Sequence, residues 1–502
     1  MTTPRTRSRI ALLTLGLASL SPAQAPGRPL FEDDERHRIM AYWAEPGRYA
    51  AEAPTDVDRR GVWQVRITPA GSVWLWGLTR GKKVPPTQNA TSPWEGWIAA
   101  KVRHDRWEAL RTARAANHDA TGRDDLPKPD AATPIQEPPL PGAMPHDLLA
   151  AVGPCPQMAE AVAPLQHTVA FDDLTLVYQD NTKMSARYAY YRFPAGVSSM
   201  GVPVRTMPPE AIDAVFRDAG IAEGPARVMK AVSILEGGFE SVNTYDTGYV
   251  SVGFIQFASL KEGAGSLGAV LRSFKAADPL GFAADFHRFG VEVDEASHLV
   301  VVDPTSGAVA VGSDANARII EDKRLIAVFG RAGGKSEGFR AAQVRAAKAI
   351  YWPSEDRVNV VLNGVPTPVR VGDLVTSEAG LATLFDRKVN TGHVDALGDA
   401  ASRVAAAQGI TTVEDLAKFE KPIVALARYR KDYLADPSLG QPAEPPVPVP
   451  TSSLRAYVPV ASRSGRTVPG AMRGHRLRRK EVKGKRKTGG ADPFPTPLSP
   501  QP

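Results

Sequence analysis

The spacing of apolar residues along this chain predicts strands mainly in its first part and helices mainly in its second. A period of two predicts strands at residues 62–67, 72–76, 174–178 and 188–191, a hairpin at 298–311 and a strand pair at 358–371. A period near 3.6 predicts helices that begin close to residues 92, 208 and 224. These elements together predict an α+β fold that is mainly α.

One predicted helix leads to Glu236. This residue follows Val232 by four positions and Met229 by seven, so we expect it on the apolar face of that helix. Gly237 and Gly238 then break the helix. Burial and the negative end of the helix dipole both disfavour a carboxylate, so the pKa of Glu236 should be raised. A carboxylic acid that keeps its proton near neutral pH can serve as the general acid for a glycosidic leaving group. The alternative is a glutamate that only flanks a helix end at the surface.

A polar turn and an alternating run follow the glycine pair. The turn at residues 246–248 predicts the tip of a hairpin that faces the end of the Glu236 helix across a cleft. Asp246 is a candidate second carboxylate, and a role as an Asx-type turn residue explains it equally well. Gln256 ends the run, and its amide can both donate and accept, which suits a sugar N-acetyl group or a buried strand.

This stretch resembles the catalytic motif of the lysozyme-like superfamily, especially soluble lytic transglycosylases and goose-type lysozymes. Their motif has a catalytic Glu, an apolar or aromatic residue three positions later, a polar loop and then Gly-Leu-Met-Gln. Glu236, Phe239 and residues 253–256 fill these positions, although the spacing is about two residues longer and Gly237 replaces the usual Ser. The resemblance implies a lysozyme-like helical domain with a small β-hairpin lobe at residues 208–435.

The candidate site combines the resemblance with the reading of the hairpin. Glu236 is the expected catalytic acid and Asp246 the second catalytic candidate, and we expect Tyr245, Ser251 and Gln256 to bind substrate.

A second segment, residues 384–392, resembles the Asp-x-x-Val-Asn-x-Gly helix of several muramidases and chitosanases. There this helix lines or braces the cleft, which implies that Asp386 and Asn390 bind substrate. A plain helix that ends in a C-cap explains Asn390 and Gly392 equally well.

The first residues predict export. Arg5, Arg7 and Arg9 precede an uncharged apolar run at residues 10–20, and small residues lead up to Ala25, which is typical of a signal peptide at residues 1–25. The run is shorter than the roughly 20 residues of a membrane-spanning helix, and no later segment is apolar enough to span a bilayer. We therefore expect a secreted, periplasmic or cell-envelope protein.

Tryptophan and proline divide the region before residue 208. Seven of the eight tryptophans lie at or before residue 107, which predicts a Trp-rich α/β module at residues 26–118. Its tryptophans either fill a core or stack on sugars. The Pro-rich residues 119–145 predict a linker, and residues 146–207 predict a strand-rich segment that packs on the catalytic domain.

Charge is concentrated in the tail. The net charge is +7, and residues 451–502 carry 12 Lys and Arg against two acids. Residues 436–502 therefore predict a disordered tail, Pro-rich and then basic, that binds an anionic envelope polymer. Cys155 is the single cysteine, which excludes an internal disulfide and a thiolate-rich zinc site. No pair of histidines has metal-ligand spacing, so we expect neither metal nor cofactor.

These observations predict an exported enzyme that cleaves the β-1,4 glycosidic bonds of peptidoglycan, as a lytic transglycosylase or a muramidase. An inverting hydrolase needs a second carboxylate roughly 6.5–9.5 Å from the acid, whereas a transglycosylase needs only one, so the role of Asp246 separates the two. Two further functions stay open: a non-catalytic cell-envelope binding protein on a degenerate lysozyme-like scaffold, and a chitosanase-like polysaccharide hydrolase.

Overall fold

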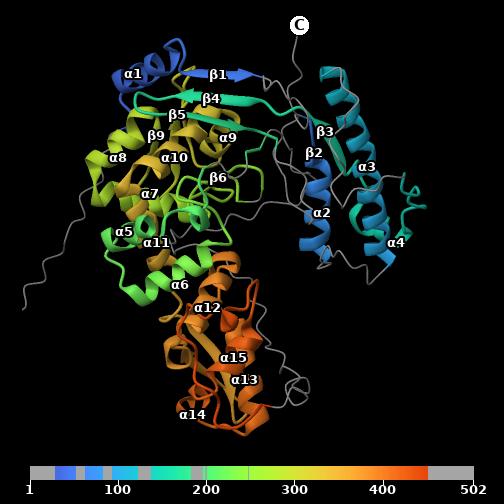
Figure 1. The fold of residues 1–502 in the computed structure, drawn as a ribbon, viewed down its shortest axis with the longest axis vertical. Coiled ribbons are helices and arrows are strands. Elements are labelled where there is room, and N and C mark those ends of the chain that lie inside the picture. The colour runs from blue at the N-terminus through green and yellow to red at the C-terminus, as the bar shows by residue number, and fades with distance from the viewer. Residues whose placement is uncertain are drawn as a thin grey trace, which may run out of the picture. The chain divides into compact units, whose positions relative to one another are not determined.

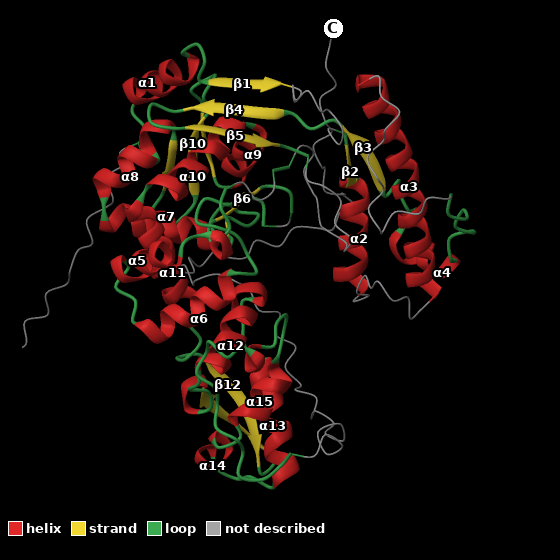
Figure 2. Ribbon diagram, in the orientation of Figure 1, coloured by secondary structure: helices red, strands yellow, loops and turns green. Residues whose placement is uncertain are grey.

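The protein is a mixed α+β fold that is mainly helical, as the apolar pattern predicts. The computed structural model describes residues 29–52, 63–82, 93–121, 137–181, 196–197, 201–246 and 248–449. These residues are 51% helix and 14% strand, and the strands form several small antiparallel sheets (Figure 1, Figure 2). The expected signal peptide, the strand expected at 188–191 and the basic part of the tail lie outside the described residues.

The described elements follow one another in this order. The first are α1 (Asp33–Ala44), β1 (Tyr49–Glu52), β2 (Gln64–Ile67), α2 (Pro69–Lys82), α3 (Pro93–Thr121), α4 (His146–Val152), β3 (Ala159–Val162), β4 (Gln166–Ala170) and β5 (Thr175–Gln179). The next are α5 (Pro209–Asp218), α6 (Glu223–Ser233), β6 (Val242–Asn243), β7 (Ser251–Val252), β8 (Phe257–Ala258), α7 (Ser266–Ala277), α8 (Pro279–Asp285), β9 (Val291–Val293), β10 (Leu299–Val302), β11 (Val309–Val311), α9 (Ser313–Glu321), α10 (Lys323–Lys335) and α11 (Glu337–Tyr351). The last are β12 (Arg357–Leu362), β13 (Val365–Arg370), α12 (Glu378–Thr391), α13 (Ala396–Gln408), α14 (Val413–Ala417) and α15 (Glu420–Ala427). Short 3-10 helices lie at Val204–Thr206, His287–Phe289, Val371–Asp373 and Tyr433–Ala435.

The buried apolar residues form three clusters. The largest, the central cluster, is built mainly from α1, β4, β5 and the elements from α5 to α12. The C-terminal cluster fills the space between the β12–β13 hairpin and helices α12 to α15. The N-terminal cluster joins β2, α2, α3 and α4, and α3 lies alongside β2 and β3 (Figure 1).

The strand predicted at residues 72–76 is wrong, because these residues belong to helix α2. In that helix Trp74, Leu75 and Leu78 are buried, whereas Val73 is 49% exposed. A strand would place Val73 and Leu75 on the same face, so this burial fits only the helical period. A short apolar run of this length satisfies both periods in the sequence alone.

The Trp-rich region does not form one module with the predicted boundaries. Trp43 of α1 packs in the central cluster, where its indole N–H donates to the carbonyl of Phe289 at 3.2 Å. Strand β1 pairs with β4, outside the N-terminal cluster. Trp74 instead anchors the N-terminal cluster and donates to the carbonyl of Gly153 at 3.3 Å. These two tryptophans are core residues of different clusters. The boundary at residue 118 fails because strands β1 and β2 pair with β4 and β3, which follow the predicted linker.

The segment expected to pack on the catalytic domain divides between two clusters. Strands β4 and β5 cover α10, where the Tyr178 hydroxyl donates to the carbonyl of Lys323. Arg331 of α10 binds Asp173 at 2.9 Å beside β5. Helix α4 and strand β3 belong to the N-terminal cluster instead, and β3 pairs with β2.

Several local predictions are confirmed. Strands β12 and β13 pair from Arg357 to Arg370, and Asn363 and Gly364 turn between them with φ values of 50° and 78°. Two successive positive φ angles are the type I′ turn that Asn-Gly favours. The hairpin of β10 and β11 and the helix that begins at Pro93 also form where the sequence predicts them.

The chain stays ordered beyond the boundary expected for the tail. Leu439 is only 4% exposed and belongs to the central cluster. The Gly440 N–H donates to Glu378 of α12 at 2.8 Å. Residues 436–449 therefore pack against the fold, contrary to the predicted disorder, because their few apolar residues find places on two clusters.

Helix α1 is fastened by a histidine between two carboxylates. His287 Nδ1 lies 2.9 Å from Glu292, and Nε2 lies 3.4 Å from Glu35 of α1. The hydrogen bond to Glu292 raises the pKa of His287 above 6.5, although burial opposes the change. The hydrogen bond from the Glu32 backbone N–H lowers the pKa of Glu35.

We expect this contact to weaken as the pH rises through the raised pKa of His287. The folded protein favours the charged imidazolium. The contact therefore contributes fully to the free energy of unfolding below the pKa that His287 has in the unfolded chain, and this contribution is lost above its pKa in the folded protein. Glu35 and Glu292, whose pKa values are lowered from 4.5, contribute above that value and lose their contribution as the pH falls. Thermal unfolding of wild type and His287→Gln between about pH 5 and pH 9 checks this. A difference in midpoint that grows with pH would contradict it.

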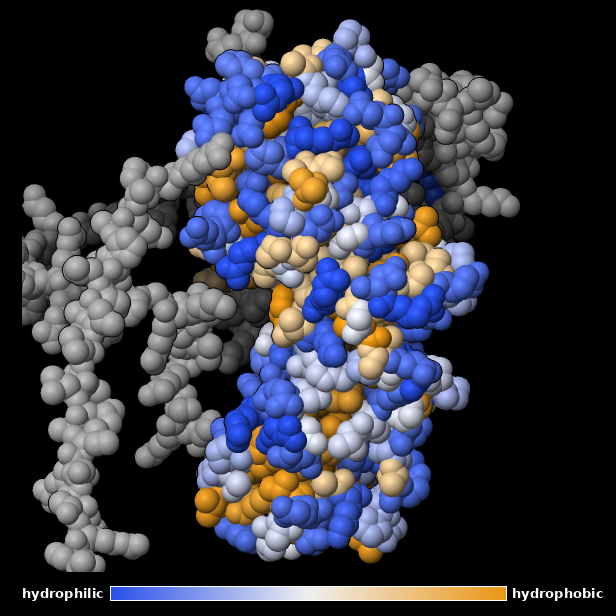
Figure 3. All heavy atoms as spheres, turned by 90° about the vertical axis from the view of Figure 1, so that its left-hand side faces the viewer, coloured by the Kyte–Doolittle hydropathy of each residue, from blue (hydrophilic) through white to orange (hydrophobic). Residues whose placement is uncertain are grey.

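The surface is mainly polar on the face drawn in Figure 3. Hydrophilic residues cover most of it, and hydrophobic residues appear in smaller groups between them. Among the described residues, no helix combines the length and the apolar character that crossing a membrane requires.

Candidate active site

Glu236 lies just beyond helix α6. The α-helix ends at Ser233, and the chain continues in tight turns, with Glu236 N–H donating to the Ser233 carbonyl at 3.0 Å. Leu235, expected on the buried stripe, is instead 41% exposed. The helix therefore ends three residues earlier than the apolar pattern predicts, because the glycine pair disfavours a further helical turn. The Glu236 side chain is nevertheless sheltered, with 12% of its surface exposed.

The glycine pair after Glu236 permits a close approach of two backbone segments. A Cβ atom at Gly238 would lie 1.8 Å from the carbonyl oxygen of Val202. A Cβ atom at Gly237 would lie 2.7 Å from the Ser241 hydroxyl. At Gly238 only glycine fits without moving the backbone, whereas at Gly237 the Ser241 side chain would have to move.

Gly238→Ala should therefore destabilise the protein by about 1–3 kcal/mol, because overpacking against backbone cannot relax by a rotamer change. Urea unfolding measures this loss. Gly142→Ala is the matched control, because nothing lies within 4 Å of a Cβ atom there. Equal stability of the two variants would contradict the close approach.

Arg430 joins Glu236 to Asp386. Its guanidinium donates to Oε1 of Glu236, and its Nε donates to Oδ1 of Asp386 at 2.9 Å. Asp386 lies on α12 and is 1% exposed. Arg430 follows α15 and is 31% exposed, so it reaches the site from the side open to solvent. The two acids thus share one cation.

Helices α6 and α12, which carry these acids, are also fixed to each other. The Arg227 guanidinium of α6 donates to the Glu378 carboxylate of α12 at 2.6 Å. Asn390, one turn after Asp386, donates to the Asp386 backbone carbonyl at 2.8 Å. The Asn390 side chain also lies close enough to Glu236 to lower the pKa of that carboxyl group. The structure therefore brings together Glu236, Asp386 and Asn390 from segments far apart in the sequence.

The surroundings of Glu236 favour its protonated form. Burial raises its pKa above 4.5, and the charge of Asp386 adds to this. Arg430 and Asn390 act in the opposite direction, but burial prevails. The pKa of Tyr351 is also raised, first by burial and also by the charge of Glu236. The direction agrees with the expectation from sequence, with burial as its main cause.

Two buried polar atoms border this group. Within the described part of the chain, Oδ2 of Asp386 and the hydroxyl of Tyr433 have no hydrogen-bond partner. Burial raises the pKa of Tyr433, and the charge of Asp386 raises it further. Asp386 therefore relies on Arg430 as its main counter-ion.

Gln256 lies next to the glycine pair. Its amide oxygen accepts from Asn243, and its Nε2 donates to the Gly253 carbonyl at 2.8 Å. A Cβ atom on Gly237 would lie 3.2 Å from that Nε2. The backbone of Gln256 has φ of 56°, a strained conformation for a residue with a side chain. The contacts hold the hairpin of β6, β7 and β8 against the turn that carries Glu236.

The remaining candidates lie in the hairpin and have structural contacts. Asp246 Oδ1 accepts from the Gly248 N–H at 2.8 Å, which is an Asx turn. Tyr245 packs against the N-terminal cluster. Ser251 is 7% exposed on β7, where it pairs with Asn243. The structure therefore separates Glu236, Gln256, Asp386 and Asn390, which gather around one turn, from these three residues, which shape the hairpin.

The sequence did not indicate Arg430, Tyr433 or Tyr351 as parts of the site. Arg430 lies outside any helix, in a segment with other basic residues, so neither period nor spacing distinguishes it. The two tyrosines lie in apolar stretches, and such stretches predict core residues.

The comparisons with known proteins add no relative. No protein-family model matches this chain. No curated protein and no solved structure matches it either. The function is therefore inferred from the residues of the site.

Exposed apolar side chains border the acid. Ile234 and Leu235, immediately before Glu236, are 45% and 41% exposed. Tyr429, immediately before Arg430, is 43% exposed, and the Arg387 guanidinium lies 5.1 Å from its ring centroid. The chain neighbours of Glu236 and Arg430 therefore include one aromatic and two aliphatic side chains that are open to solvent.

Proposed function

We propose that this chain is an exported enzyme that cleaves the β-1,4 glycosidic bonds of peptidoglycan, with Glu236 as its general acid. One observation carries the proposal: Glu236 is sheltered, and this burial raises its pKa. A general acid works best when its pKa lies near the working pH, so a raised glutamate pKa suits this task. The signal peptide expected at residues 1–25 supports the export.

The lysozyme-like resemblance supports the same conclusion. It rests on two segments, one around Glu236 and one at residues 384–392, which are separated by more than a hundred residues in the sequence. In the structure Arg430 contacts both Asp386 of the second segment and Glu236 of the first. The two segments resemble motifs of the same superfamily, and both lie at the expected acid. This favours a lysozyme-like catalytic domain.

Arg430 fits the needs of proton transfer. When Glu236 gives its proton to the leaving oxygen, negative charge develops on its carboxylate. The guanidinium of Arg430 already contacts that carboxylate, so it stabilises the charge as the charge appears. Burial raises the pKa of Glu236 and so favours its protonated form, and Arg430 lowers the cost of releasing the proton.

The other acids favour a route with one carboxylate. Asp386 is almost fully buried and held by Arg430, so it is poorly placed to activate a free water molecule. One oxygen of Asp246 is used to hold the hairpin turn. A lytic transglycosylase needs no second carboxylate, because the hydroxyl of the sugar itself is the nucleophile. We therefore favour a transglycosylase over an inverting hydrolase.

Charge favours peptidoglycan over chitosan. Chitosan carries ammonium groups and needs spare negative charge in its binding site. Here the two acids of the site share Arg430, and burial raises the pKa of Glu236. The site therefore offers little attraction to a polycation, whereas an N-acetylated sugar needs none.

Product analysis by mass spectrometry tests the proposal. The purified protein is incubated with peptidoglycan and, separately, with chitosan. Anhydro-muropeptides from peptidoglycan support a transglycosylase, and reducing ends would show a hydrolase. Products from chitosan alone would mean that chitosan, and not peptidoglycan, is the substrate. No product from either polymer would leave a cell-envelope binding protein as the better description.

The basic tail should tether the enzyme to an anionic envelope polymer. The tail lies outside the described residues, and its positive charge supports the proposed tether. Truncation after Pro450 should lower binding to isolated envelopes at low salt and leave turnover of short soluble fragments unchanged. Sedimentation with envelopes measures this, and adding salt should abolish the difference, because the Debye length falls from about 10 Å at 0.1 M to about 3 Å at 1 M. Equal binding by both forms at low salt would contradict the tether.

A further inference from the structure

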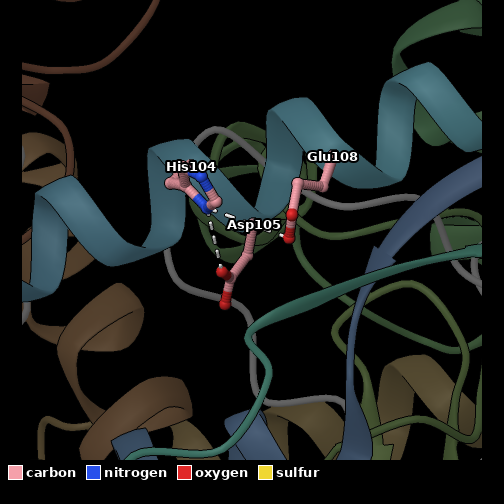
Figure 4. A group of neighbouring side chains, drawn as sticks. All are labelled: His104, Asp105 and Glu108. Carbon is pink, nitrogen blue, oxygen red and sulfur yellow. Dashed lines mark ion pairs between the residues drawn. The ribbon is translucent and has the colours of Figure 1, made fainter. Parts of the chain in front are cut away.

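Three potential metal ligands lie together on helix α3, away from the residues around Glu236. They are His104, Asp105 and Glu108, and one ligand atom of each lies within 4.8 Å of the others (Figure 4). His104 Nδ1 is 3.7 Å from Asp105 Oδ1 and 3.8 Å from Glu108 Oε2. The spacing of histidines and cysteines in the sequence does not indicate this group, because it combines a single histidine with two carboxylates.

His104 is the unusual member of the group. It is 6% exposed, yet within the described part of the chain it forms no hydrogen bond. Its Nδ1 points between the two carboxylates at distances that are too long for hydrogen bonds (Figure 4). An imidazole nitrogen that makes no hydrogen bond to either acid can offer its lone pair to a cation between them.

We propose that His104, Asp105 and Glu108 bind one divalent transition-metal ion, such as Zn²⁺. Ligands of a tetrahedral zinc ion lie about 2.0–2.2 Å from the metal and therefore about 3.4 Å from one another. The His104 nitrogen needs to approach each carboxylate oxygen by only a few tenths of an ångström to reach this spacing, and the two carboxylate oxygens lie within 4.8 Å of each other. One imidazole with two carboxylates suits zinc and its neighbours, whereas calcium and magnesium prefer oxygen ligands alone.

The surroundings support both access and orientation. The Glu108 side chain is 43% exposed, so an ion can enter from its side. The Met158 N–H donates to Oδ2 of Asp105 at 2.7 Å and leaves Oδ1 directed at His104. Bonds of this kind orient metal ligands in many sites. Met158 adjoins β3, so a bound ion strengthens the contact between α3 and that strand.

Lys101 competes with the ion. Its Nζ lies 2.5 Å from both carboxylate oxygens of Asp105, one helical turn away. The ammonium group therefore supplies the positive charge that this buried acid requires. A metal ion has to displace it, which the long and flexible lysine side chain permits.

Zinc titration of the full-length protein by isothermal calorimetry tests the proposal. We expect one site, and we expect Co²⁺ in its place to give visible d–d absorption of a nitrogen- and oxygen-ligated ion. Glu108→Gln keeps the shape of a half-exposed side chain and should weaken binding by about 10-fold or more, since even partners of ligands are worth 10- to 100-fold. His104→Ala should weaken it at least as much. His146→Ala removes an exposed histidine at the start of α4 and should change nothing.

Lys101→Met gives the sharpest result, because it should tighten zinc binding, by about tenfold or more, as the competing charge is removed. Weaker or unchanged binding in this variant would overturn the competition between lysine and metal. Absence of a single zinc site in wild type and Lys101→Met alike would overturn the metal site, as would full binding by Glu108→Gln. The group would then be an ion-pair network of Lys101, His104 and the two acids.

Discussion

Replacing Glu236 with glutamine should lower the rate of peptidoglycan cleavage by about 10²- to 10⁴-fold, the usual contribution of a general acid. Glutamine keeps the shape of the side chain and can still accept from Arg430, so the fold should survive. It has no proton to give, and this alone should account for the loss. Release of soluble muropeptides from purified peptidoglycan measures the rate, and circular dichroism checks the fold.

Glu240→Gln is the matched control. Glu240 lies four positions later, and its carboxylate accepts from the Val202 backbone N–H, a bond that a glutamine oxygen can also accept. This variant should keep nearly all activity. Wild-type activity in Glu236→Gln, or equal losses in the two variants, would remove the assignment of Glu236 as the acid.

Replacing Arg430 with methionine should destabilise the protein by about 3 kcal/mol or more, because it leaves a buried carboxylate without its cation. That carboxylate is Asp386, which is 1% exposed and has one oxygen with no partner among the described residues. The variant should also lose activity, because Glu236 loses the charge that stabilises its anion. Urea unfolding and the cleavage assay measure the two effects separately.

The double variant Arg430→Met with Asp386→Asn separates stability from catalysis. Neutralising Asp386 removes the unpaired charge, so the double variant should regain part of the lost stability. Its activity should stay low, because Glu236 still lacks the guanidinium. A double variant no more stable than Arg430→Met alone would show that Arg430 does not act as the counter-ion of Asp386.

Local signals in the sequence were sufficient for several elements. The Asn363-Gly364 turn was predictable because a type I′ turn needs two positive φ angles, which this pair tolerates best. The end of α12 was also predictable, since Gly392 adopts the left-handed conformation that closes a helix. In both cases the determining interactions lie within a few residues.

The sequence was insufficient to predict features that depend on contacts between residues far apart in the chain. Residues 72–76 satisfy a strand period and a helix period, and only the burial of Trp74 and Leu75 in the folded protein distinguishes them. Arg430 joins the site through contacts that cross most of the domain, so no local pattern marks it. The same holds for His104, whose group becomes visible only when side-chain distances are known.

The ion pair of Glu236 and Arg430 also bears on when the protein becomes competent during its synthesis. The two residues are 194 positions apart, so a chain that has emerged only as far as α12 already holds Glu236, its hairpin and Asp386, but not the guanidinium. Closing so long a loop is slower than forming the helices and hairpins on either side of it. Under the proposed function, the site is therefore complete only when almost the whole folded region has been delivered.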